Sequence, residues 1–352
     1  MGGRERGSLV AEEFIDPREV EWHPRRAGSL VGHEEAEARL LQACQSEKLH
    51  HAWLISGSRG IGKATLAYRF AKFLLQNRDS SQVKAHSRLH TAPESHVFRQ
   101  VAAGAHPDLL VIQRAVDQRA KRLKTVIPVE DAREAQGFFA RTSASGGWRV
   151  AIVDAADDLN SESANALLKV IEEPPRKSVF LIVCHQPGRL LRTIRSRCLK
   201  LELGNLRGDQ TVEVLRGLPS DALAGESHAL RQAVDLSRGS PGKALELLGS
   251  QGAAAFAEFL KREKRSAATA VEVAAAFSGR ETAEDYFIFC DLLVDWIAEQ
   301  ARTAGLAGDG AALAAAHDDI NSSLRQADAL NLDRRQTVTD ALMRLEEALR
   351  AS

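Results

Sequence analysis

Hydrophobic and polar positions follow two alternating patterns along the first part of the chain. Short apolar runs, typical of buried strands, are separated by longer stretches in which apolar residues recur every three or four positions, as in amphipathic helices. The runs are residues 52–55, 109–112, 150–153, 179–183 and 199–203. This alternation predicts an α/β domain with a largely parallel sheet, covered by helices on both faces and ending near residue 205.

Beyond residue 205 the strand pattern stops and only helical periodicity remains. Residues 206–250 are predicted to form a small helical domain, with Ser240 as the cap of a helix and Pro241 at its first position. Residues 251–352 are alanine-rich and predict a second helical domain. One apolar stripe in that domain is typical of core packing between helices. It consists of Tyr286, Phe289, Leu293 and Trp296.

Two segments lack either pattern. Residues 1–27 are polar and punctuated by Pro and Gly, which predicts a mobile N-terminal arm before a domain that spans residues 28–205. Residues 77–105 are also polar and include His86 and His90, four positions apart. A metal needs more ligands than these two, so a solvated loop without metal is the prediction.

Composition narrows the class of protein. A chain of 352 residues exceeds a single ordinary core, and its 47 basic and 47 acidic residues cancel, so its overall charge gives no reason to expect autonomous nucleic-acid binding. The four cysteines lie far apart without a C-x-x-C pair, which argues against disulfides and a thiolate metal site and fits a reducing cytosol. Without a long apolar run or a signal-like N-terminus, the prediction is a cytoplasmic protein that does not contact the membrane.

A glycine-rich turn follows the first predicted strand and opens a helix. Residues 57–65 read GSRGIGKAT, in which Gly57, Gly60 and Gly62 allow backbone N–H groups to surround phosphate oxygens and Lys63 can reach the terminal phosphates. In this context the loop predicts a Walker A nucleotide site, and the alternative is an ordinary strand-to-helix turn. The residue after the lysine normally supplies a hydroxyl to Mg²⁺, but here it is Ala64.

Neighbouring residues do not repair that loss of metal binding. Thr65 lies one position further along the helix, about 100° away, and is expected to substitute poorly. Asp154 ends the predicted strand at 150–153 and occupies the position of a Walker B aspartate. The prediction is therefore a site that can hold ATP without efficient hydrolysis and with compromised Mg²⁺ coordination.

A third motif carries the resemblance to a known family. Residues 163–175 read SANALLKVIEEPP and are followed by Ser196, Arg197 and Cys198. This pair of motifs resembles the signature of clamp-loader subunits of bacterial DNA polymerase III, the AAA+ family that includes delta-prime and gamma/tau subunits. His50-His51-Ala52, the HPDL turn at 106–109 and residues 239–245 extend the resemblance over about residues 28–250. The remaining residues match only in being helical.

The resemblance implies a AAA+ P-loop domain, a helical lid and a helical collar that forms oligomers. It also implies delta and gamma/tau subunits as partners, with the sliding clamp and primer-template DNA reached through the assembled complex. In this family Arg197 would enter the nucleotide site of a neighbouring subunit. Three departures affect the chain's own site: Ala64 replaces the metal hydroxyl, Ala155 replaces the glutamate that activates water, and Gly242 replaces a sensor arginine.

Those departures predict a scaffold that lends Arg197 to a neighbouring ATPase and itself hydrolyses little ATP. The four-cysteine zinc module of gamma/tau subunits is missing from the sequence, so no zinc is expected. Two alternatives stay open, a working ATPase of the gamma/tau kind and a nucleic-acid-binding module. For Arg197 alone, the alternative is an ordinary surface ion pair.

Overall fold

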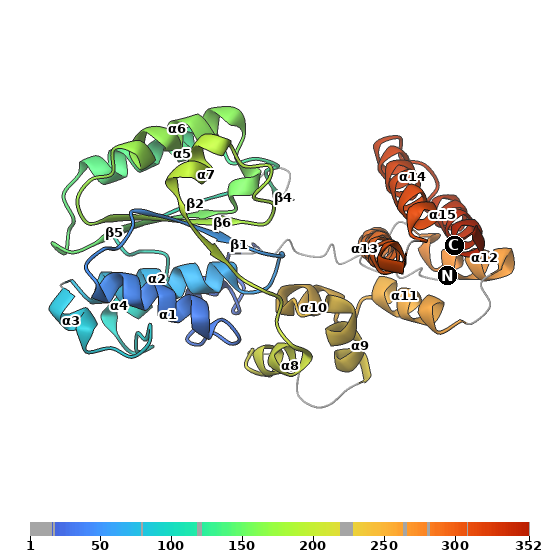
Figure 1. Ribbon diagram of the computed structural model, residues 1–352, viewed down its shortest axis with the longest axis horizontal. Coiled ribbons are helices and arrows are strands. Elements are labelled where there is room, and N and C mark those ends of the chain that lie inside the picture. The colour runs from blue at the N-terminus through green and yellow to red at the C-terminus, as the bar shows by residue number, and fades with distance from the viewer. Residues whose placement is uncertain are drawn as a thin grey trace, which may run out of the picture. The chain divides into compact units, whose positions relative to one another are not determined.

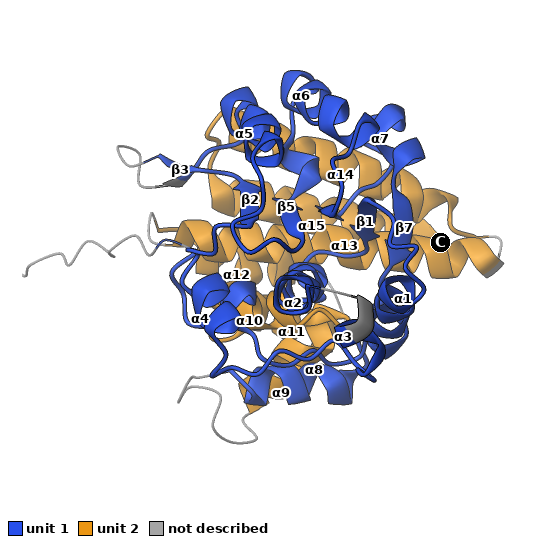
Figure 2. Ribbon diagram, turned by 90° about the vertical axis from the view of Figure 1, so that its left-hand side faces the viewer, with its two compact units in different colours: residues 1–222 blue, residues 223–352 orange. Residues whose placement is uncertain are grey.

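The structure is a computed structural model that describes residues 16, 18–78, 80–117, 122–218, 228–262, 266–279, 282–307 and 309–351. The chain divides into two compact units, residues 1–222 and 223–352, and each is described by itself (Figures 1 and 2). Among the described helices, none is long and apolar enough to cross a membrane.

The first unit is built on a five-stranded parallel sheet in the order β2-β5-β6-β1-β7. Its strands are β1 (Ala52–Ser56), β2 (Leu109–Gln113), β5 (Arg149–Asp154), β6 (Ser178–Cys184) and β7 (Leu199–Glu202). All five strands that the sequence predicted are present, and the predicted parallel α/β fold is confirmed. Because the strands are parallel, all their carboxyl ends lie at one edge of the sheet and all their amino ends at the other.

Both faces of the sheet are covered by helices, and for that reason the strands are continuous apolar runs. Figure 1 shows α1, α2, α3 and α4 on one face and α5, α6 and α7 on the other. Alternate residues of β1 belong to different cores: Trp53 and Ile55 pack with α1 and α2, whereas Leu54 packs with α5 and α6. The bounds are α1 (Glu34–Gln45), α2 (Lys63–Gln76), α5 (Val129–Ala140), α6 (Ser161–Glu172) and α7 (Arg192–Arg197).

The segment 77–105, predicted as a solvated loop, is partly helical. It contains α3 (Ser80–Lys84) and α4 (His96–Ala102), the latter capped by the Ser95 side chain. Leu89 is fully buried, and its N–H donates to the Glu37 carboxylate at 2.7 Å. A few buried apolar residues therefore hold a segment whose average composition is polar.

The predicted N-terminal arm is wrong for the part that the structure describes. Most of residues 1–17 lie outside the described residues, but residues 18–27 pack on α2 through η1 (Pro24–Arg26). His23 is buried against the Tyr68 ring, and the Lys72 ammonium donates to the Ala27 carbonyl at 2.7 Å. A second small addition is a hairpin of β3 (Val116–Asp117) and β4 (Arg122–Leu123), strands too short to show a periodic pattern.

The second unit is helical throughout its described residues, as the sequence predicted. The helix α8 (Gly208–Arg216) belongs to the first unit. Ser240 caps α10 by accepting the Lys243 N–H, and Pro241 is its first residue. The predicted apolar stripe on α13 is core, with Phe289 and Leu293 fully buried. The helices are α9 (His228–Ser237), α10 (Pro241–Leu247), α11 (Gln251–Lys261), α12 (Ala267–Ala274), η4 (Ala275–Phe277), α13 (Ala283–Ala307), α14 (Ala311–Ala329) and α15 (Arg334–Ala351). The division into lid at 206–250 and collar at 251–352 stays a prediction.

Candidate functional site

The Walker-type loop lies where the sequence placed it, between β1 and α2 at the carboxyl edge of the sheet. Gly57, Gly60 and Gly62 all have positive φ, and Gly62 is the residue that precedes the first turn of α2. A Cβ on Gly57 would lie 2.5 Å from the Leu203 carbonyl oxygen, so this tight turn admits only glycine. The loop thus has the backbone that phosphate binding requires.

Lys63 is buried inside this loop, with only 3% of its surface exposed. Its ammonium donates to the carbonyl oxygens of Gly57 at 2.8 Å and Ser58 at 2.5 Å. Burial lowers the pKa of Lys63 to about 8, although the nearby carboxylates of Asp154 and Asp157 act in the opposite direction. A desolvated cation held by weak neutral acceptors is well suited to bind an anion.

Asp154 ends β5 at the same edge, and burial raises its pKa to about 6, opposed by the charge of Lys63. The next residue, Ala155, is buried and carries no group that could activate water. Asp157 accepts the backbone N–H groups of His185 at 2.6 Å and Gln186 at 2.7 Å, so its carboxylate anchors the turn after β6. Asp158 pairs with Arg114 at 3.0 Å. Both later acids are therefore committed to structural contacts.

The residues at this edge provide groups for binding phosphate but not a full set of ligands for Mg²⁺. The three glycines, the start of α2 and Lys63 provide N–H groups and positive charge for phosphate oxygens. Ala64 places a methyl group where a metal-binding hydroxyl belongs, and Thr65 is half-buried on a different side of α2. The residues present fit the phosphates of a nucleotide, but they do not complete a magnesium site.

The opposite, amino edge of the sheet carries Arg197. It is the last residue of α7, directly before Cys198 and β7, and its side chain is 40% exposed. Its Nη2 lies 2.9 Å from Glu172 Oε1, and its Nη1 donates to the Thr193 carbonyl at 3.1 Å. Arg197 thus lies at an edge of the sheet, and the surface ion pair that the sequence analysis gave as the alternative is present.

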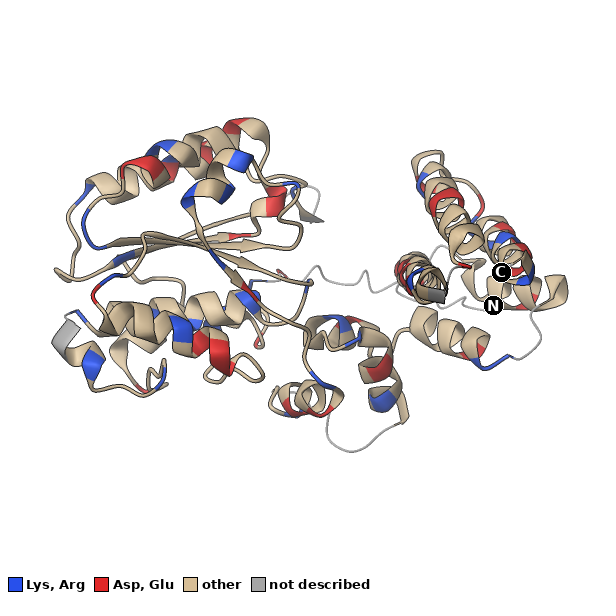
Figure 3. Ribbon diagram, in the orientation of Figure 1, with Lys and Arg blue, Asp and Glu red and all other residues tan. Residues whose placement is uncertain are grey.

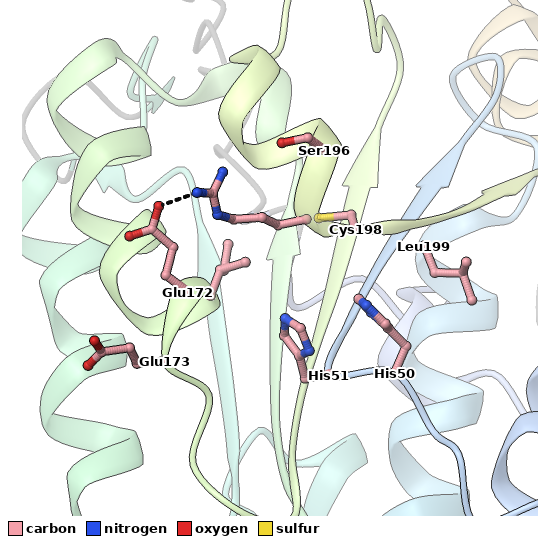
Figure 4. A pocket seen from close by; sticks show the side chains of 9 residues that line it. His50, His51, Glu172, Glu173, Ser196, Cys198 and Leu199 are labelled. Atoms are coloured by element: carbon pink, nitrogen blue, oxygen red, sulfur yellow. Dashed lines mark ion pairs between the residues drawn. The ribbon is translucent and has the colours of Figure 1, made fainter.

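An open pocket surrounds Arg197 (Figure 4). It is lined by His50, His51, Ile171, Glu172, Glu173, Ser196, Arg197, Cys198 and Leu199. The Ser196 hydroxyl donates to the Thr193 carbonyl at 3.0 Å, and burial raises the pKa of the Cys198 thiol to about 12. Ser196 therefore bonds within α7, Cys198 packs against the core, and the thiol is not activated for chemistry.

The remaining predicted residues lie elsewhere. Gly242 is in α10 of the second unit and has no side chain to offer a nucleotide. His86 bonds to Asn77 Oδ1 at 3.1 Å and packs edge-on against Phe73, which is a structural role. Within the described ranges, no three His, Cys, Asp or Glu side chains gather as a metal ion would require.

Two residues at the two edges, His185 and Glu172, were not singled out from the sequence. Asp157 anchors the turn after β6, and His185 follows it with a buried Nδ1 that lacks a hydrogen-bond partner among the described residues. Burial lowers the pKa of His185 to about 4, so the ring is neutral. Glu172 pairs with Arg197. A signal for Glu172 was available, since two acids end a helix where the dipole favours basic residues.

Comparisons with known proteins show which family this chain belongs to. A family described as DNA polymerase III, delta subunit, matches residues 32–207. A DNA polymerase III subunit delta' of Pseudomonas aeruginosa is 35% identical over 200 residues, which are 56% of this chain and 56% of that protein. The delta' subunit of Escherichia coli is 32% identical over 209 residues, 59% of this chain and 58% of the relative. The tau subunit of Escherichia coli is 33% identical over 230 residues, 64% of this chain and 33% of the relative. The chain thus spans less than two thirds of the length of these relatives.

Proposed function

The chain belongs to the DNA polymerase III delta subunit family, and from this we propose that it is a delta-prime-like subunit of the clamp loader. In that role it takes part in DNA replication by helping to load the sliding clamp onto primed DNA, as part of the DNA-directed DNA polymerase III holoenzyme in the cytoplasm. Within the loader it is a scaffold with little ATPase activity of its own. It supplies Arg197 to the nucleotide site of a neighbouring ATPase subunit.

The contrast between the two sheet edges carries this proposal. At the carboxyl edge, Ala64 and Ala155 stand at the positions of the metal hydroxyl and the base, while Asp157 and Asp158 are held in other contacts. The absence of a positioned base alone lowers a rate by about 10²–10⁴. The amino edge retains its arginine, exposed to solvent at the end of α7. The chain thus lacks the groups that would act on its own nucleotide but keeps the arginine that would act on a neighbour's nucleotide, and this combination supports a scaffold.

Arg197 acts by electrostatic stabilisation. A guanidinium beside the γ-phosphate of a neighbour stabilises charge on the transferring phosphoryl group and its oxygens, an effect of about 10³–10⁵ in rate in comparable systems. Arg197 is accessible to such a neighbour because its side chain is 40% exposed, and it lies at the edge opposite the chain's own Walker loop. The chain's own loop can retain ATP in a structural role through Lys63 and the glycine backbone.

The proposed partners are delta and gamma/tau subunits, with the sliding clamp and primer-template DNA reached through the assembly. Direct binding of the isolated chain to nucleic acid is not favoured, since acidic and basic residues are equal in number and α5 and α6 carry both signs (Figure 3). The alternative of a gamma/tau-like motor is kept because tau matches the chain at a similar identity. That alternative requires an active carboxyl edge.

The decisive experiment uses the clamp loader reconstituted from this chain and its delta and gamma/tau partners. Arg197→Ala should leave assembly intact by size-exclusion chromatography and slow hydrolysis at the neighbouring site on the order of 10³-fold. Nucleotide affinity should change far less, because the arginine acts on the transition state. Arg197→Lys retains the charge without the planar fork and should recover only part of the rate.

Lys63→Ala in the same complex tests the opposite edge. If the chain's own site is silent, this substitution should change turnover of the assembly little. Should Lys63→Ala abolish turnover while Arg197→Ala leaves it intact, the chain is a motor and the scaffold proposal is wrong.

A further inference from the structure

The guanidinium of Arg197 is held by two contacts from different elements. Glu172, the last residue of α6, approaches Nη2 at 2.9 Å, and the Thr193 carbonyl, one turn earlier in α7, accepts from Nη1 at 3.1 Å. Figure 4 shows the Glu172 carboxylate reaching over to the guanidinium, whereas Glu173 points away from it. Together the two contacts fix the plane of the guanidinium at the amino edge.

The position of Glu172 is unfavourable for the helix that carries it. The carboxyl end of α6 has partial negative charge, so an acid there is disfavoured, and here two acids, Glu172 and Glu173, follow one another. Helix stability therefore gives no reason for Glu172. Its contact with Arg197, which belongs to the next helix along the chain, supplies one.

The ion pair is too exposed to act as a lock. The side chains of Arg197 and Glu172 are 40% and 44% exposed, and such pairs typically change an equilibrium by a factor of at most about five. A triphosphate, with several negative charges, competes easily with one solvated carboxylate. The pair is nevertheless sufficient to reduce the number of side-chain conformations of a long, flexible arginine, which favours its productive orientation before the neighbour binds.

We propose that Glu172 is a positioning residue for Arg197, which orients the guanidinium so that its outward face meets the γ-phosphate of the neighbouring subunit. This inference rests on the proposed role of Arg197 in trans. A guanidinium has five N–H donors in one plane. Glu172 contacts Nη2 and the Thr193 carbonyl contacts Nη1, which fixes the orientation of the plane and leaves the remaining N–H donors to act on phosphate oxygens.

The test compares two adjacent acids in the reconstituted loader. Glu172→Ala should lower kcat about three- to tenfold with less than a twofold change in KM, because pre-orientation affects the transition state more than ground-state binding. Glu173→Ala removes the same charge from the same helix end and should behave as the unmodified chain. Glu172→Gln keeps an oxygen that can accept a hydrogen bond, so its kcat should lie between those of Glu172→Ala and Glu173→Ala.

A double-mutant cycle separates positioning from a general structural role. In a chain that already carries Arg197→Ala, the further change Glu172→Ala should have no effect on kcat, because there is no guanidinium left to orient. An equal kcat for Glu172→Ala and Glu173→Ala overturns the inference, as does a further loss in the Arg197→Ala background. A rise in kcat for Glu172→Ala also overturns it, since Glu172 would then restrain the arginine.

These outcomes can be told apart from failure of the proposed function. If Arg197→Ala leaves turnover unchanged, the role of Arg197 in trans is wrong whatever Glu172 does. If Arg197→Ala lowers turnover while Glu172→Ala is silent, the role of Arg197 stands and only the positioning role of Glu172 is lost.

Discussion

Charged residues occur at both edges of the same sheet, but their surroundings differ. At the carboxyl edge Lys63 is 3% exposed. Burial lowers the pKa of Lys63 to about 8 and raises the pKa of Asp154 to about 6. At the amino edge Arg197 and Glu172 form an ion pair with 40% and 44% of their side chains exposed. The carboxyl edge therefore carries a buried cation, whereas the amino edge carries a solvent-exposed arginine.

The difference in burial suggests a separate chemical role for each edge. Burying a lysine without a full counter-charge costs stability, and bound phosphate would offset that cost. The carboxyl edge keeps this electrostatic arrangement even though Ala64 and Ala155 lack the groups for metal binding and hydrolysis. We infer that phosphate binding and catalysis are separable at this edge.

The largest effect expected at the carboxyl edge concerns hydrolysis by the free chain. Without a base or a complete metal site, its ATP turnover should be at least about 10²-fold below 1 s⁻¹, the lower end of common enzymes. A phosphate-release assay on the purified chain measures this, and Lys63→Ala gives the background. Turnover near about 1 s⁻¹ that disappears in Lys63→Ala would show that the carboxyl edge is catalytic.

A second prediction compares how much two acids at the amino edge contribute to stability, the buried Asp108 and the exposed Glu172. Asp108 is 1% exposed and accepts hydrogen bonds from Ser143 Oγ, Ala144 N, Ser145 N and Ser145 Oγ at 2.8–3.1 Å. Asp108→Ala leaves these donors without their acceptor and should lower the free energy of unfolding by about 2–4 kcal/mol. Urea denaturation measures it, and Glu172→Ala is the exposed control, with a change below about 1 kcal/mol.

The pH dependence of stability gives an independent check on Asp108. Burial alone would raise its pKa, but the hydrogen bonds from Ser145, Ala144 and Ser143 outweigh burial and lower it below the usual value. A lowered folded-state pKa stabilises the protein above the unfolded pKa of about 3.9, and that contribution is lost as the pH falls through the folded pKa. In Asp108→Ala, the free energy of unfolding should therefore fall less steeply as the pH is lowered below about 4. An unchanged pH dependence would contradict the lowered pKa of Asp108.

The sequence predicted the sheet well because its strands are buried on both faces and show as continuous apolar runs, as in residues 179–183. The Walker loop and Arg197 were predicted from motifs, and the structure places them at opposite edges. Features that depend on a few tertiary contacts were missed. Residues 18–27 and 77–105 have polar compositions, yet single buried residues such as His23 and Leu89 hold them in place.

The pairing of Glu172 with Arg197 was missed for a related reason. The two residues lie on different helices, α6 and α7, and no periodic pattern connects them. Only the unfavourable charge at the end of α6 pointed to a partner, and it did not identify which basic residue that was. A contact between side chains of two different helices can be identified only once the packing of those helices is known.

A third, smaller effect tests phosphate binding at the carboxyl edge. Burial lowers the pKa of Lys63 in the free chain to about 8, and a bound phosphate should raise it because the anion stabilises the charged form. Affinity for ADP should therefore weaken as the pH rises through about 8, by up to tenfold per pH unit, with proton uptake on binding. Calorimetry in buffers of different ionisation enthalpy measures both quantities.

The control for that experiment is Lys63→Met, which should remove the pH dependence above 8 together with most of the affinity. Because Ala64 offers no metal hydroxyl, EDTA should change the affinity little, and Ala64→Thr should make binding more dependent on Mg²⁺. Strong binding to the unmodified chain that requires Mg²⁺ would contradict the separation of phosphate binding from metal binding.

The smallest expected effect is on stability at the amino edge, where Arg197→Ala should change the free energy of unfolding by less than about 1 kcal/mol. The pair with Glu172 is exposed, and both ions can be solvated once the contact is lost, so no buried charge is left unpaired. Thermal and urea unfolding of the free chain measure this change. A loss of several kcal/mol would mean that Arg197 is part of the folded framework, and the drop in loader turnover expected for Arg197→Ala could then be a folding defect. A small change, combined with that drop, ties the effect of Arg197 to the neighbouring active site.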